Sequence, residues 1–197
     1  MKAIELGPDW LAEEMPPGYN TRLLEIQRLS EELRAMGRFG QLLWTIGDEL
    51  VEAVRQAFVA MRFESMPIPG AVGLLAVTLD GNRRLLVNVS SAQQTIQKKS
   101  PELAQVFHLQ QELVGDSDRI VLVTNSHVGT RPADRPAPVE PDALKLLQRI
   151  GANVLPAPAL FRLWTLSLQD RDRARGWVDR LHAQDGGSFE LPNLPVV

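Results

Sequence analysis

The segment AVGLLAVTLDGNRRLLVNVSS, residues 71–91, predicts a β-hairpin at the centre of the fold. Residues 71–79 are apolar and strand-like, and a second apolar run, LLVNV, covers residues 85–89. The sequence DGN at 80–82 suits a tight turn, because Gly and Asn accept positive φ and Asp bonds to its own backbone. We expect any chemistry of this chain at the end of the second strand, in the sequence NVS at 88–90.

A parallel crossover is predicted to follow the hairpin. A helix begins at Ser100-Pro101, where Ser suits the N-cap and Pro the first turn. The apolar run IVLVT at residues 120–124 is typical of a strand that is covered on both faces. A strand, a helix and a strand at this spacing form a crossover unit, which makes the two strands parallel.

The rest of the chain alternates helices with short strands. Apolar spacing predicts helices over residues 20–36, 42–63, 142–150, 158–168 and 171–184, and short strands over 152–156 and 188–191. This order predicts a three-layer α/β/α domain with a central mixed sheet of four or five strands, preceded by an N-terminal helical arm. The predicted divisions are an arm and helix at 1–36, the α/β domain at 37–185 and a Pro-rich tail at 186–197.

Composition excludes several classes of chemistry. The 197 residues include no Cys, which rules out disulfides, thiolate catalysis and Cys-based zinc sites. None of the three histidines is spaced from another as a metal ligand would be. The sequence contains neither of the glycine-rich nucleotide-binding motifs and no Gly-x-Ser-x-Gly nucleophile motif. We therefore expect no cofactor. The net charge is −3, no apolar run is long enough to span a membrane, and we expect a cytoplasmic protein.

The N-terminal arm and first helix carry apolar residues that could contact a partner. Several apolar positions, from 26 to 54, approach a heptad seam that Gly40 and Gly47 interrupt. One interpretation is packing against the chain's own domain, and the other is contact with a protein partner or a second copy. The residues concerned are Trp10, Leu11, Leu23, Ile26, Leu29 and Leu33.

Several motifs together resemble the PD-(D/E)XK nuclease, or restriction-endonuclease-like, superfamily. The early helix holds Gly-x-x-Leu-x-x-x-Val at 47–54, and the hairpin has Asp-Gly at its turn before Leu-Leu-Val-x-Val. The sequence IQKK at 96–99 is similar to the family's Ile-x-Lys-Lys after the catalytic strand. PDAL at 141–144 and LFRLW at 160–164 are similar to two further family motifs. The resemblance covers roughly residues 37–183 and implies a restriction-endonuclease-like fold.

The resemblance also implies where a metal site would lie, and the expected residue types are missing there. The family's helix Glu falls at Val51, its Asp at Gly73 or Leu74, its strand Glu at Asn88 and its Lys at Ser90. Mg²⁺ prefers oxygen ligands, usually with one or two carboxylates, so these positions predict a degenerate site without metal. Acids that could have taken over the ligand role are Glu52, Glu64 and Asp80.

Three functions therefore stay open at the sequence level. The first is a catalytically inactive nuclease-fold scaffold that binds a protein partner or itself. The second is a nucleic-acid-binding module that does not cut, since phosphate contacts give salt-dependent affinity. The third is a Mg²⁺-dependent endonuclease with relocated ligands. The candidates for a basic nucleic-acid-binding rim are Arg83, Arg84, Lys98, Lys99, Arg131 and Arg135.

Overall fold

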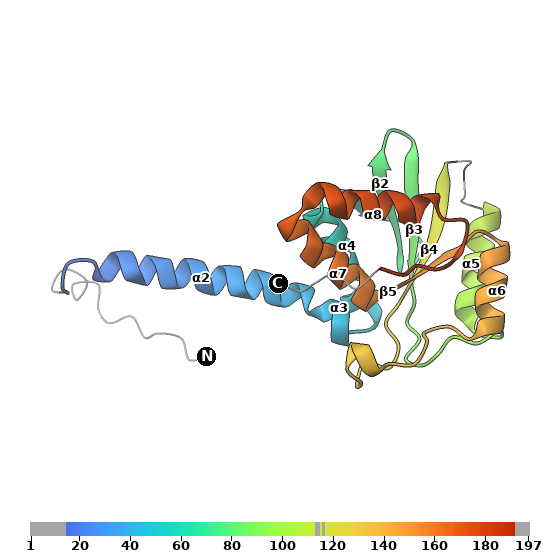
Figure 1. Ribbon diagram of the computed structural model, residues 1–197, viewed down its shortest axis with the longest axis horizontal. Helices are drawn as coiled ribbons and strands as arrows, with labels where there is room; N and C mark the ends of the chain where they lie inside the picture. The colour runs from blue at the N-terminus through green and yellow to red at the C-terminus, as the bar shows by residue number, and fades with distance from the viewer. Residues whose placement is uncertain (1–14, 113–114, 116, 192–197) are drawn as a thin grey trace. The chain divides into compact units, whose positions relative to one another are not determined.

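A computed structural model describes residues 15–112, 115 and 117–191. The chain divides into two units, Met1–Arg38 and Phe39–Val197. Within the described part of the first unit, the main element is the helix α2, Tyr19–Phe39, whose last residue belongs to the second unit (Figure 1). The sequence predicted that this helix ends at residue 36, but α2 continues through Gly37, because one Gly weakens a helix without ending it.

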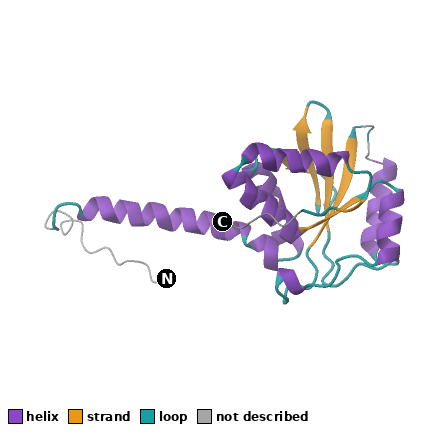
Figure 2. Cartoon of the chain, in the orientation of Figure 1, coloured by secondary structure: helices purple, strands orange, loops and turns teal. Residues whose placement is uncertain are grey.

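The second unit contains the predicted helices and strands in order, with one additional strand and with one predicted helix divided in two (Figures 1 and 2). Its elements are α3 (Gln41–Trp44), α4 (Gly47–Ala60), β1 (Glu64–Pro67), β2 (Leu74–Asp80), β3 (Arg83–Val89), α5 (Pro101–Glu112), β4 (Asp118–Thr124), η1 (Pro132–Asp134), α6 (Pro141–Arg149), β5 (Asn153–Pro156), α7 (Ala157–Gln169), α8 (Arg171–Ala183) and β6 (Gly187–Ser188).

The strands form one mixed sheet of six strands in the order β1-β2-β3-β4-β5-β6. The pairs β1–β2 and β2–β3 are antiparallel, whereas β3–β4, β4–β5 and β5–β6 are parallel. The predicted hairpin and crossover are therefore confirmed. The expected number of four or five strands was too low, because β1 reads ESMP and buries only Ser65, which is too weak a pattern to indicate a strand.

The predicted helix over 42–63 is two helices. Thr45 is extended, with ψ 163°, and its Oγ1 donates to the carbonyl oxygen of Gln41 at 2.8 Å. Gly47 has φ +63°, a left-handed value that favours glycine. The chain therefore turns between α3 and α4. No helix in the described part of the chain is both long and apolar enough to cross a lipid bilayer.

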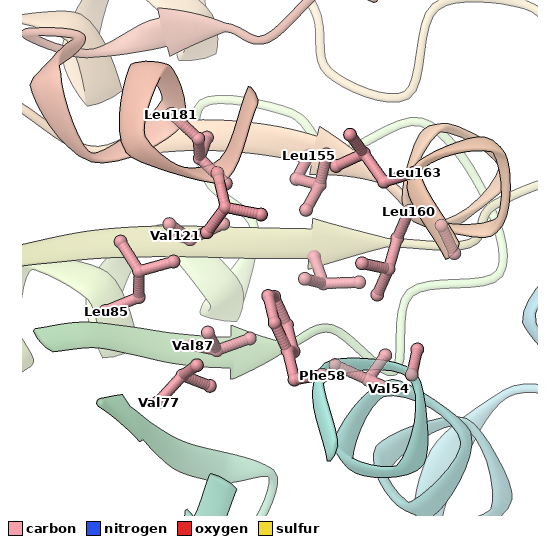
Figure 3. Packing of buried hydrophobic residues seen from close by; sticks show 14 of the residues in the cluster. Val54, Phe58, Val77, Leu85, Val87, Val121, Leu155, Leu160, Leu163 and Leu181 are labelled. Carbon is pink, nitrogen blue, oxygen red and sulfur yellow. The ribbon is translucent and has the colours of Figure 1, made fainter. Parts of the chain in front are cut away.

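Two apolar clusters use alternate residues of the strands. The first contains Val77, Leu85, Val87 and Val121, and it includes side chains from α4, α7 and α8 (Figure 3). The second contains Leu86 among other strand residues, with side chains from α5 and α6. Because successive residues of a strand point to opposite faces, the two clusters lie on opposite faces of the sheet.

Candidate functional site

Asn88 and Ser90 lie where β3 ends, and both are buried. Asn88 pairs in register with Leu74 of β2 and Leu122 of β4, and it is only 3% exposed. Leu74 and Leu122 belong to the second apolar cluster, so the Asn88 side chain points to the face that α5 covers. The end of β3 is therefore filled by its neighbours. The Asn88 Nδ2 has no hydrogen-bond partner among the described residues.

Ser90 makes local hydrogen bonds and contacts a buried acid. Its Oγ accepts from the Ala92 N–H at 3.0 Å and donates to Glu102 Oε1 at 3.5 Å. Glu102 lies in the first turn of α5, where the helix dipole favours a negative charge. Sequence reasoning missed Glu102 as a neighbour of Ser90. The sequence did place Glu102 two residues after the predicted helix start at Ser100. That position alone indicates a role in stabilising the helix rather than a contact with Ser90.

The residues at which the resemblance implies a second metal ligand leave no room for a carboxylate. Gly73 has φ +74°, and a Cβ on it would lie 3.2 Å from the Val89 carbonyl oxygen. The Gly73 carbonyl also accepts from the Val89 N–H at 2.8 Å, which holds the two strands together there. Leu74 is 3% exposed and belongs to the second cluster. An acid at Gly73 would be strained, and one at Leu74 would put a charge in the core.

Val51 does not meet these residues. It is partly buried against the first apolar cluster, whereas Asn88 points to the face of the second. The structure therefore brings Gly73, Leu74, Asn88 and Ser90 together and leaves Val51 on the other face of the sheet.

None of the three candidate relocated acids reaches Asn88. Glu52 binds Arg55 through two bonds of 2.7 and 2.8 Å and accepts from Gln56, and these contacts lower its pKa to about 2. Glu64 is in register with Thr78, which is in register with Arg84, four residues from Asn88 along β3. Asp80 binds Arg83 at the other end of β3. Glu52 and Asp80 thus each bind an arginine, and Glu64 and Asp80 lie away from Asn88 along the sheet.

The side chains at the end of β3 do not fit Mg²⁺. They supply one amide, one hydroxyl and the single carboxylate of Glu102. No group of three or more His, Asp or Glu side chains suited to a metal exists within residues 15–112, 115 and 117–191. A divalent ion prefers several oxygen ligands that include carboxylates, so no catalytic step through a metal follows from this site.

The six candidate basic residues do not form one rim. Arg83 binds Asp80 and Asp179, and Arg84 binds Asp118, all where β3 begins. The strand is seven residues long, or about 20 Å, and the other four candidates follow its far end or that of β4. Of those four, Arg135 is partly buried, while Lys98, Lys99 and Arg131 are exposed and make no ion pair with a described residue.

The partner candidates in the first helix are exposed. Within α2, Leu23 is partly exposed, and Ile26, Leu29 and Leu33 are 46%, 44% and 64% exposed. No residue of this helix is buried. The other two partner candidates, Trp10 and Leu11, lie outside the described residues.

Comparisons of the chain with protein-family models, with curated proteins and with solved structures found no match. The function proposed below therefore rests on the residues of this chain.

Proposed function

We propose that this chain is a catalytically inactive, restriction-endonuclease-like protein that works as an assembly scaffold and associates with a second copy of itself. The two apolar clusters on opposite faces of the sheet support a three-layer α/β/α arrangement. The order of an early helix, a hairpin, the run 96–99 and the helix α5 agrees with the resemblance.

The loss of catalysis is supported by the way the ligand positions are filled. A metal clamp contributes several kcal/mol to transition-state stabilisation, and it needs acids that converge. Here Gly73 cannot accept a side chain without strain, Leu74 is core, and Asn88 is neutral. Ser90 supplies no positive charge where the resemblance implies Lys.

Self-association is carried by one observation, the exposed apolar stripe of α2. Ile26, Leu29, Leu33 and Met36 recur at spacings of three, four and three residues, which are the a and d positions of two heptads. All four are at least 44% exposed. Most helical stability in proteins comes from packing of an apolar face, so a partner that covers the stripe stabilises α2. The stripe of a second copy is the matching surface, because a and d residues interdigitate with their own kind.

Light scattering coupled to gel filtration tests this association on the full chain. We expect a mass of about twice the chain's 21.9 kDa, and the double substitution Ile26→Glu/Leu33→Glu should give the monomer. Leu24→Glu is the matched control: Leu24 is 66% exposed but lies about 160° around the helix from Ile26. A wild type that stays monomeric throughout a concentration series contradicts self-association. A loss of the dimer in Leu24→Glu equal to that in the double variant contradicts a contact through this stripe.

A nuclease assay tests the absence of catalysis separately. We expect plasmid DNA and structured RNA to stay intact with the purified chain and either Mg²⁺ or Mn²⁺. Metal-dependent cleavage that disappears in Asn88→Ala contradicts the proposal, because it would place a working ligand at the end of β3.

A nucleic-acid-binding function is the second candidate, and the surface around Lys98, Lys99 and Arg131 favours it. The two loops that carry these residues are joined by backbone bonds, including one from Ile96 to Pro138 at 2.9 Å. If this surface binds phosphates, Lys98→Glu/Lys99→Glu lowers duplex affinity in fluorescence anisotropy and reduces its salt dependence. Arg83→Gln, at the other end of β3, is the control that leaves affinity unchanged. No binding at low salt excludes this candidate.

A further inference from the structure

A pocket of about 360 Å³ opens where β4 and β5 end and α7 begins. The elements that meet there are labelled in Figure 1. Ligands of α/β proteins with parallel strands bind outside the carboxyl ends of those strands. The volume lies at the lower end of the range for small-molecule sites, which is about 300 to 1,000 Å³. None of the former metal-ligand positions lines this pocket, so it is separate from the end of β3.

Arg135 gives the pocket a fixed positive charge that no acid neutralises. Its guanidinium donates to three neutral oxygens: the carbonyls of Thr130 and Leu43, and Asn125 Oδ1 at 2.8 Å. No carboxylate contacts it within the described ranges, and burial lowers the pKa of the guanidinium. Arginine has five N–H donors, so two remain after these three bonds. The three bonds thus hold the Arg135 side chain in place, and its two remaining N–H groups can donate to a ligand.

The start of α7 adds further donors to the same pocket. Ala159 of its first turn lines the pocket, and its backbone N–H, like the others of a first helical turn, has no partner within the helix. The helix dipole makes this end positive. Arg162, one turn further on, also lines the pocket, is exposed and pairs with no acid in the described chain.

The remaining lining suits an organic group. Phe189 and Leu191 are buried apolar side chains, and five prolines supply rigid apolar walls without N–H donors: Pro132, Pro136, Pro138, Pro156 and Pro158. Glu190 is the one acid in the lining, and it is exposed. Two arginines therefore leave the pocket with an excess of positive charge.

We propose that this pocket binds a small phosphate monoester, with the phosphate held by Arg135, Arg162 and the Ala159 N–H at the start of α7. The organic group of the ester lies against the prolines and Phe189. A phosphate fits better than a carboxylate because its three terminal oxygens can use donors from both arginines and the helix at once.

Isothermal titration calorimetry of the full chain tests the proposal with phenyl phosphate and adenosine 5′-monophosphate as probes, and with benzoate as the carboxylate comparison. We expect both phosphate esters to bind and benzoate to bind more weakly. Affinity for the esters should rise between pH 5 and 7, since the second ionisation of a phosphate monoester has a pKa of about 6. Absence of binding by both esters, or tighter binding of benzoate, overturns the assignment.

Matched variants locate the site. Arg162→Gln is expected to weaken phenyl phosphate binding about tenfold or more. Arg171→Gln, at the exposed start of α8 and outside the pocket, is the control and should leave affinity unchanged. Equal affinities in wild type and Arg162→Gln, or equal losses in Arg162→Gln and Arg171→Gln, would place binding elsewhere.

Discussion

Arg84 and Asp118 join the two central strands at the point where their parallel pairing begins. They are register partners on β3 and β4, and the guanidinium binds both carboxylate oxygens, Nε to Oδ1 at 3.0 Å and Nη2 to Oδ2 at 2.7 Å. The Asp118 side chain is 3% exposed, and its Oδ2 also accepts from the Gly115 N–H at 2.9 Å. A buried carboxylate thus fixes the strand, the turn before it and the neighbouring strand.

Asp118→Asn should lower the free energy of unfolding at pH 7 by about 1–2 kcal/mol, a value that allows for the exposure of Arg84. Burial raises the pKa of Asp118, but the bonds from Arg84 and Gly115 outweigh it, and the net shift is below the ordinary 3.8. The contribution is therefore present above pH 3.8 and is lost as the pH falls through the folded pKa.

Urea unfolding of wild type and Asp118→Asn from pH 7 to pH 3 measures this effect. The difference between the two proteins should shrink at the acidic end. Asp142→Asn is the control, because Asp142 and its partner Lys145 are 75% and 69% exposed, and it should change stability by less than about 0.5 kcal/mol. A constant difference at all pH values contradicts the ionic explanation.

Gly73→Ala should lower the free energy of unfolding by about 1–3 kcal/mol. The backbone at Gly73 is left-handed, and the added Cβ would meet the Val89 carbonyl oxygen at 3.2 Å. Gly129→Ala is the matched control, since nothing lies within 4 Å of the Cβ position there. Thermal unfolding of the two variants gives the comparison. Equal stability of Gly73→Ala and Gly129→Ala would mean that position 73 tolerates a side chain, including the carboxylate that the resemblance implies there.

Asn88→Leu should leave stability unchanged or raise it by about 1 kcal/mol, because it removes a buried Nδ2 that has no partner in the described structure. Asn153→Leu provides the contrast. Asn153 is fully buried, and its Nδ2 donates to the carbonyls of Leu181 and Gln184 at 2.9 and 3.1 Å. Its loss should cost about 2–3 kcal/mol. A large loss in Asn88→Leu would indicate a bonded or liganded amide at the end of β3.

The carboxyl group of Glu52 should titrate near pH 2 rather than at its ordinary value of 4.5, mainly because of its bond to Arg55 and then that to Gln56. Carbon-detected NMR titration of the side-chain carboxyl measures the midpoint. Arg55→Gln should raise the pKa toward 4.5, and Lys145→Gln, which touches a different acid, should not move it. A midpoint near 4.5 in the wild type would mean that Glu52 is not held by Arg55 and Gln56 in solution.

The sequence was enough to predict those parts of the fold that depend on local patterns. The hairpin at 71–91 has two apolar runs and a Gly-containing turn, and the crossover has a helix start and a buried apolar strand. Strand β1 was missed because its stability comes from pairing with β2 rather than from its own residues. The break between α3 and α4 was missed because the apolar spacing continues across Thr45 and Gly47.

The candidate site shows the same division between local and tertiary information. The sequence alone indicated that Asn88 and Ser90, two residues apart, lie at the end of one strand. The positive φ of Gly73, the burial of Leu74 and the position of Val51 on the other face depend on tertiary packing. The expected basic rim is divided in the structure, because Arg83 and Arg84 begin β3, whereas Lys98 and Lys99 follow its other end.

The short outer strands of the sheet limit how copies of this protein can meet. One edge is β1, four residues that end in Pro67, and the other is β6, two residues long. An open edge invites strand addition and uncontrolled aggregation, and proline and short length both discourage it. Sheets of two copies therefore gain few backbone bonds by joining edge to edge. The proposed contact through α2 avoids these edges, and it predicts an assembly of defined size instead of a growing fibre.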